Sequence, residues 1–274
     1  MRNPAKFTTA VLAAGALTLG LTACGSDKDS ADTSGPLVVA ASPTPHAEIL
    51  NYVKENLAKK AGLDLEVKEF TDYTTQNPST EDGSVDANYF QNQPYLDDFN
   101  KKNGTKIVPV VTVHLEPLGL YSHKAKSADA LKSGATVAVP NDTVNEARAL
   151  KLLDTNGIIT LKDGAGNEAT PADIAKNPKN LKFKELEAAQ TPRSLDDVDA
   201  AVINGNYALE ADLKPADDAL VLESAKNNPY GNFLAVKDGD QDDPRVKKLA
   251  KLLTSPEVKK FIADKYAGSV LASF

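Results

Sequence analysis

Residues 37–70 read LVVAASPTPHAEILNYVKENLAKKAGLDLEVKEF, and this stretch alternates between two kinds of periodicity. It opens with the apolar run LVVAAS, which predicts a buried strand. Apolar residues then recur at helical spacing from Ile49 to Ala61, and Gly62 is the residue type that commonly ends a helix. Residues 63–70 return to a period of two. A strand, a helix and a second strand in succession predict an α/β fold.

The same alternation continues along the chain. Helical stretches separate most of the later strand-like segments, which read KIVPVVTV at 106–113, ATVAVP at 135–140, LKFKELE at 181–187, DAAVI at 199–203 and ALVLES at 219–224. Alternating strands and helices with short connections favour largely parallel sheets that are covered on both faces.

The length of this region predicts two lobes. Residues 36–274 are enough for two lobes of about 100 to 150 residues each. We expect the chain to cross between them near 114–122 and to return near 228–236. Lobe 1 then contains residues 36–117 plus 235–274, lobe 2 contains residues 118–234, and a ligand cleft lies between them.

The N-terminus has the features of a secretory signal. Arg2 and Lys6 are followed by a mostly apolar run at 8–21 that is too short to span a membrane. The segment closes with LTAC, which resembles a bacterial lipobox, and Cys24 is the only cysteine. We therefore predict a signal peptide at 1–23 and a lipid on Cys24; the alternative is a secreted chain with a free thiol. The polar residues of 24–35 predict a flexible tether.

Charge and motif content argue against several functions. Without Arg2 and Lys6 the chain has 29 of its 31 basic residues against 38 acidic ones, a net charge of −9, so nucleic acid is not an expected partner. The chain has no G-x-S-x-G, P-loop or G-x-G-x-x-G motif, and no paired cysteines. His46 is expected at a solvated helix start, while His114 and His123 flank the first crossing. We expect no catalytic residue, no metal and no cofactor.

The stretch AVPNDTVNEARAL at 138–150 predicts an anion site. Thr143 and Glu146 form a capping-box pattern, so a helix should begin near Val144. Asn145 and Arg148 then lie on one face of its first turns. A helix N-terminus with these side chains suits an anionic group that also accepts hydrogen bonds. The alternative is an arginine extended over a surface turn.

Six stretches spread over most of the chain after the tether form a recognisable set. They are FTDY at 70–73, DANYFQNQPYLDDF at 86–99, VHLEPLGLYS at 113–122, AVPNDTVNEARAL at 138–150, residues 177–208, and NPYGNFLAV at 228–236. In this order they resemble one family, the methionine-binding (NlpA-type) lipoproteins of bacterial ABC importers.

The resemblance implies a two-lobed periplasmic-binding-protein-like fold and a set of ligand-binding residues. Tyr73, Phe90 and Asn92 correspond to the part that encloses the side chain and its thioether. Many family members have histidine at position 92, so Asn92 is a departure that bears on ligand identity. The residues that correspond to the part fixing the amino-acid backbone are Asn145, Arg148, Asn204 and Asn232. The resemblance thus implies that the anion expected at 138–150 is the α-carboxylate of a bound amino acid.

Local sequence offers other roles for several of these residues. Tyr73 follows a strand and Phe90 is expected to open a helical segment, so either ring also suits an ordinary core. Asn204 ends the apolar strand AAVI and also suits a helix N-cap or a turn. Glu116, beside Pro117 at the crossing, suits a ligand ammonium or a salt bridge in the hinge.

The resulting prediction is a lipid-anchored substrate-binding protein that captures methionine and delivers it to an importer's permease and ATPase. It is expected at the extracytoplasmic side of the cell membrane and is not an enzyme. The alternatives are a binding protein for another amino acid or a methionine-containing dipeptide, a surface lipoprotein with a scaffold role, and a secreted hydrolase. A hydrolase needs an activated nucleophile beside a base, and the only thiol is at the anchor.

Overall fold

The computed structural model describes residues 35–274, which belong to one compact unit of the chain. The expected signal peptide, Cys24 and nearly all of the expected tether lie outside these residues. Among the described residues, none of the helices combines the length and apolar character needed to cross a membrane.

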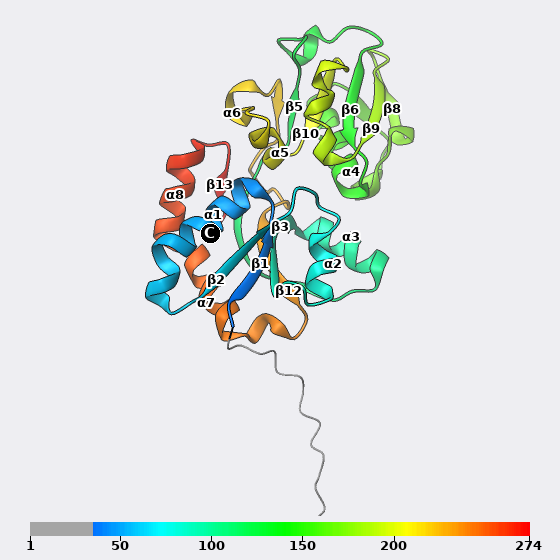
Figure 1. The fold of residues 1–274 in the computed structure, drawn as a ribbon. Coiled ribbons are helices and arrows are strands. Elements are labelled where there is room, and N and C mark those ends of the chain that lie inside the picture. The colour runs from blue at the N-terminus through cyan, green and yellow to red at the C-terminus, as the bar shows by residue number, and fades with distance from the viewer. Residues whose placement is uncertain (1–34) are drawn as a thin grey trace, which may run out of the picture. The chain divides into compact units, whose positions relative to one another are not determined.

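The first lobe is built on a six-stranded sheet (Figure 1). Strand β1 pairs in parallel with β2 and β3, whereas β12 runs antiparallel between β3 and β4, and β13 pairs antiparallel with β4. The strands are β1 (Leu37–Ala41), β2 (Leu65–Glu69), β3 (Ala87–Asn92), β4 (Ile107–Leu115), β12 (Asn232–Lys237) and β13 (Leu271–Ala272).

The second lobe is built on a five-stranded sheet in the order β11-β5-β10-β6-β9. Here β6 pairs in parallel with β9 and β10, and β5 is antiparallel to β10 and β11. The strands are β5 (Gly119–Tyr121), β6 (Thr136–Pro140), β9 (Lys182–Leu186), β10 (Ala200–Ile203) and β11 (Val221–Leu222), beside a small hairpin of β7 (Thr160–Leu161) and β8 (Ile174–Lys176).

Helices cover these sheets, and each lobe has its own apolar core. In the first lobe α1, α7 and α8 lie on one side of the sheet and α2 and α3 on the other (Figure 1). The helices are α1 (Glu48–Val53), α2 (Gln76–Glu81), α3 (Gln93–Asn103), α4 (Thr143–Thr155), α5 (Gly205–Glu210), α6 (Pro215–Asp218), α7 (Pro244–Leu253) and α8 (Pro256–Tyr266). Irregular turns continue α1 to Ala61, and Gly62, at φ +63°, ends them.

The α/β architecture with two lobes agrees with the sequence prediction, but the expectation of largely parallel sheets is wrong. Parallel pairing is confined to one part of each sheet. The chain leaves the six-stranded sheet after Leu115, enters the other at Gly119 and returns after Leu222, so β12 re-enters between β3 and β4 in the opposite direction. The sequence prediction placed residues 232–234 in lobe 2. Because β12 begins at Asn232, these residues instead pair in the six-stranded sheet of the first lobe.

Candidate functional site

A cavity with about 360 Å³ of empty space, its mouth included, is lined by side chains from both lobes. All eight residues that were expected to bind a ligand line it, seven of them assigned by the resemblance and Glu116 by its place at the crossing: Tyr73, Phe90, Asn92, Glu116, Asn145, Arg148, Asn204 and Asn232. His46, Gln91, Tyr95, Gly205 and Asn206 complete the lining.

One wall of the cavity is aromatic. The Tyr73 ring centroid lies 5.8 Å from that of Phe90 and 5.9 Å from that of Tyr95, and the Tyr207 ring packs behind it at 5.0 Å. Apolar faces and ring edges of this kind suit an aliphatic or thioether side chain. The expectation that Phe90 opens a helical segment is wrong. Phe90 lies in the fully buried strand β3, and α3 begins only after Asn92.

The N-terminus of α4 contains a chain of hydrogen bonds that fixes two amide groups. The Asp142 carboxylate accepts from the Asn145 backbone N–H and from Asn145 Nδ2, both at 3.0 Å. Since the carboxylate can only accept, Asn145 must turn its Oδ1 to Asn204, whose Nδ2 donates to it at 2.8 Å. Asn204 Oδ1 is thereby left buried and without a hydrogen-bond partner within residues 35–274.

The cap of this helix differs from the sequence prediction. Asp142 caps α4, which begins at Thr143, so the assignment of Thr143 and Glu146 as a capping box is wrong. The Asp142 carboxylate is one residue closer to the strand, where it reaches both the backbone and the side chain of Asn145. Asn145 therefore holds Asn204 in place.

A second amide in the cavity, that of Asn206, is fixed from the aromatic wall. Tyr73 Oη donates to Asn206 Oδ1 at 2.5 Å. Burial raises the pKa of Tyr73 well above its usual value, so the phenol keeps its proton. Asn206 Nδ2 is buried without a partner among the described residues. The cavity thus contains a free acceptor on Asn204 and a free donor on Asn206.

Arg148 is buried and already paired with a carboxylate. Its Nε donates to Glu223 Oε1 at 2.9 Å and its Nη2 to Glu223 Oε2 at 2.5 Å. Nη2 also donates to the backbone carbonyl of Glu116 at 3.1 Å, and the guanidinium carbon lies 4.1 Å from the centroid of the Tyr230 ring. The alternative of an arginine extended over a surface turn is wrong. Only Nη1 makes no hydrogen bond among the described residues.

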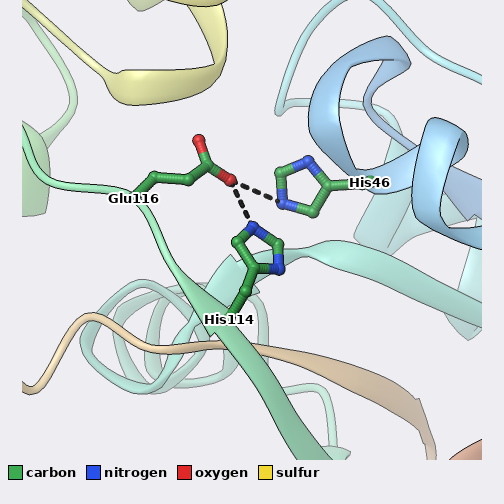
Figure 2. Close-up of side chains that lie close together, drawn as sticks. All are labelled: His46, His114 and Glu116. Atoms are coloured by element: carbon green, nitrogen blue, oxygen red, sulfur yellow. Dashed lines mark hydrogen bonds and ion pairs between the residues drawn. The ribbon is translucent and has the colours of Figure 1, made fainter. Parts of the chain in front are cut away.

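Glu116 joins two histidines at the crossing between the sheets (Figure 2). Its Oε1 lies 2.6 Å from His114 Nε2 and 3.2 Å from His46 Nε2. Burial lowers the pKa of His46 to about 4 and that of His114 to about 3, and it raises the pKa of Glu116. Both imidazoles are therefore neutral near pH 7. Gly205 permits this arrangement, since a Cβ there would lie 2.7 Å from Glu116 Cβ.

The expected exposure of His46 is wrong, and the reason lies in the turn that carries it. His46 is 1% exposed, because the turn Pro43–Ala47 places its ring against Tyr89 and His114. His46 Nε2 also lies 3.0 Å from Asn232 Oδ1. Asn232 is the first residue of β12, so it is a strand residue of the cavity rather than part of a turn.

Asn92 combines two roles at the edge of the cavity. It ends β3, and its Oδ1 accepts from the Tyr95 backbone N–H at 3.2 Å, which caps α3. A capping side chain of this type typically contributes about 1 kcal/mol to stability. Substitution at position 92 therefore changes both the cavity and the start of α3.

His46, His114 and Glu116 have the residue types of a metal site, and their candidate ligand atoms lie within 4.8 Å of one another. The contacts of Glu116 Oε1, 2.6 Å to His114 Nε2 and 3.2 Å to His46 Nε2, are hydrogen-bonding distances. In this structure the three side chains therefore form a hydrogen-bonded group.

Sequence reasoning missed several cavity residues. Asn206 follows Asn204 by two positions at the end of a predicted strand, and Tyr95 follows Asn92 by three, so close spacing to assigned residues was an available signal. Glu223 gave no such signal, because it lies 75 positions from Arg148. The exposed side chain of His123 lies 3.1 Å from Asp196 and takes no part in the cavity.

Comparison with known proteins gives consistent matches over nearly all described residues. A family model described as NlpA lipoprotein matches residues 37–274. The chain is 43% identical over 255 residues to the methionine-binding lipoprotein MetQ of Bacillus subtilis, covering 92% of this chain and 93% of the relative. It is 42% identical over 257 residues to the D-methionine-binding lipoprotein MetQ of Escherichia coli, with the same coverage.

Solved structures agree with these matches. A nutrient binding protein from Burkholderia cenocepacia, solved bound to methionine, superposes with a TM-score of 0.84 at 51% identity, covering 87% of this chain and all of that one. A periplasmic substrate-binding protein of an ABC transporter from Coxiella burnetii gives 0.83 at 43% identity, covering 86% of this chain and all of that one.

Proposed function

The chain belongs to the NlpA lipoprotein family, and we propose that it is a lipid-anchored substrate-binding protein that captures methionine for an ABC importer. The observation that carries the proposal is a small cavity that combines an aromatic wall with unpaired buried polar atoms. A scaffold protein has no use for a buried acceptor and a buried donor that lack partners, since each costs stability. A ligand that pairs them removes this cost.

In the proposed complex the methionine side chain lies along Tyr73, Phe90 and Asn92. The ammonium group is held by Glu116 and Asn204 Oδ1, both of which accept hydrogen bonds. The carboxylate faces Arg148 Nη1 and Asn206 Nδ2, which are free to donate. Asn145 and Asn232 act through neighbours, the first by orienting Asn204 and the second by contacting His46.

We propose that the protein carries out no reaction. Of the residues that the structure describes, those that line the cavity include no serine, threonine, cysteine or lysine. Burial raises the pKa of the lining tyrosines Tyr73 and Tyr95, so neither is an activated nucleophile. Capture, closure of the two lobes and delivery to a permease and its ATPase then account for the whole function.

Titration calorimetry tests the proposed ligand. The protein, freed of endogenous ligand by unfolding and refolding, should bind methionine with one site per chain. Glutamine tests whether the site accepts a polar side chain. Norleucine, which lacks the sulfur atom, tests the contribution of the thioether. If methionine gives no heat and no shift in melting temperature, this ligand assignment is wrong.

A methionine-containing dipeptide is the one alternative that a particular observation favours. A second hollow of similar size shares Tyr73 and Tyr95 with the cavity, and Asp72, Asp142 and Tyr207 also line it. Movement of the shared rings would give a longer ligand room. The same calorimetry with methionylglycine distinguishes the two ligands.

The anchor, the location and the lobe boundaries are also proposals. We propose that Cys24 carries the lipid and that the protein faces the extracytoplasmic side of the membrane. We also propose that one lobe contains residues 36–117 plus 232–274 and the other residues 118–231, since β12 begins at Asn232. Replacing Cys24 with alanine should release the protein into the soluble fraction with unchanged methionine affinity, whereas Ser26→Ala should leave it bound. A Cys24→Ala protein that stays with membranes contradicts the anchor.

Position 92 should influence specificity. Replacing Asn92 with histidine should tighten methionine binding or narrow the range of accepted side chains, because an imidazole packs against a thioether and still donates a hydrogen bond. The same change should lower stability by about 1 kcal/mol, since the amide cap of α3 is lost. Calorimetry over a panel of amino acids, with Gln93→His as control, measures the first effect. Identical selectivity removes Asn92 from the ligand site.

A further inference from the structure

We propose that His46 and His114 are positioning residues that keep the Glu116 carboxylate ionised and fixed in place for the ligand's ammonium group. His114 lies outside the cavity lining, and both rings are almost completely buried. The inference rests on the proposed function, since it concerns how the same site holds an amino acid. It explains why two buried histidines stand beside Glu116, although His114 does not line the cavity.

Hydrogen bonding places a proton on His46 Nε2. Asn232 Nδ2 is 3.4 Å from the Tyr230 carbonyl oxygen, which can only accept, so Asn232 Oδ1 faces His46. His46 Nε2 then lies between two acceptors, Asn232 Oδ1 at 3.0 Å and Glu116 Oε1 at 3.2 Å. A nitrogen between two acceptors must carry hydrogen.

His114 presents its Nε2 proton for a different reason. Its Nδ1 is hydrogen-bonded to the hydroxyl of Tyr89, and burial raises the pKa of Tyr89 well above its usual value. The phenol therefore keeps its proton and donates a hydrogen bond to Nδ1. In a neutral ring the other nitrogen then carries the hydrogen, so Nε2 donates to Glu116 Oε1 at 2.6 Å.

One oxygen of Glu116 thus receives two histidine N–H donors, and neither histidine binds the other oxygen, which is open to the ligand. The backbone N–H of Asn206 also favours the charged form of Glu116. Figure 2 shows the second oxygen turned away from both rings. It faces the turn at Gly205, where a Cβ would lie 3.3 Å from it. Two donors on one oxygen fix the rotation of the carboxylate, and they favour its charged form.

The buried carboxylate needs this support because burial raises its pKa. The positive charge of Arg148 favours the ionised form of Glu116, although this guanidinium is already paired with Glu223. The other titratable or charged groups whose electrostatic influence reaches Glu116 are His46, Tyr73, Tyr89, Glu210 and Tyr266. None of these is a cation near neutral pH. Besides Arg148, the partners that favour the ionised form are therefore neutral N–H groups, those of the two histidines and of the Asn206 backbone.

The test is the pH dependence of methionine affinity between pH 4.5 and 8, measured by calorimetry. Affinity should be constant where Glu116 is ionised and should fall as the pH drops through its pKa, because a protonated acid does not pair with an ammonium. Replacing His114 with leucine removes a donor and raises the Glu116 pKa. The acid midpoint of binding should then move up by about one unit, a tenfold loss of affinity below it. His114→Gln retains an N–H donor and should recover part of the shift.

Controls separate this role from simple support of the fold. His123→Leu removes the exposed histidine and should leave the profile unchanged. His46→Leu and His46→Gln repeat the comparison at the second donor to Glu116, His46 Nε2. Tyr89→Phe removes only the hydroxyl that bonds to His114. These variants replace His114→Leu if that protein does not fold. If every folded variant has the wild-type midpoint, the proposal is wrong. If wild type does not bind methionine at any pH, it is the proposed function that fails.

Discussion

Replacing Glu116 with glutamine should weaken methionine binding by roughly thirty-fold to several thousand-fold. The ligand's ammonium group loses water when it enters the cavity, and in the proposed complex Glu116 is the anion that receives it. Loss of one partner of a buried charge pair typically costs on the order of 2 to 5 kcal/mol. Calorimetry at pH 7.5 measures the change. The substitution keeps the size of the side chain, so the contact with Gly205 is preserved.

Glu210→Gln is the matched control for this variant. Glu210 lies on α5 and is close enough to influence Glu116 electrostatically, yet it does not line the cavity. It should bind methionine within about threefold of wild type, a difference of only ~0.7 kcal/mol. Equal affinities for Glu116→Gln and Glu210→Gln contradict the assignment of the ammonium to Glu116.

Replacing Arg148 with methionine should affect both folding and binding. The free energy of unfolding should fall by about 3 to 5 kcal/mol, because the largely buried Glu223 carboxylate loses its partner. Binding should weaken by about tenfold or more, since the ligand carboxylate loses a charge-assisted hydrogen bond worth about 1.5 kcal/mol or more. Chemical denaturation and calorimetry measure the two effects separately.

A second substitution distinguishes the structural part of this effect from the ligand part. The double variant Arg148→Met with Glu223→Gln leaves no unpaired charge, so most of the lost stability should return. Its methionine affinity should stay as low as in the single variant, because the guanidinium is still missing. Recovery of affinity together with stability means that Arg148 supports the fold and does not contact the ligand.

Much of the fold could be predicted because local periodicity determines it. The strand at 37–42, the helix ended by Gly62 and the strand at 63–70 are all present, since each depends on neighbouring residues. The direction of β12 could not be predicted in the same way. It depends on where the chain returns between β3 and β4, which no local pattern specifies.

The candidate site shows the same difference between local and long-range features. The family resemblance identified seven residues that line the cavity, and the position of Glu116 at the crossing identified an eighth. The interactions between them, however, join distant parts of the chain. Asn232 lies 186 positions from His46, and Glu223 lies 75 positions from Arg148. A sequence pattern shows that Arg148 follows a helix start; it does not show that a carboxylate has already neutralised it. The carboxylate site predicted at 138–150 is therefore weaker than a free arginine implies.

The most direct measurement of the central claim is mass spectrometry of the small molecule that co-purifies with the chain from Gly25 onward. The protein is purified without added amino acids, unfolded, and the released material is identified and quantified against the protein. We expect methionine at close to one molecule per chain. Recovery of a different amino acid or of a dipeptide in that ratio, or of nothing from a protein that also fails to bind added methionine, would contradict the account.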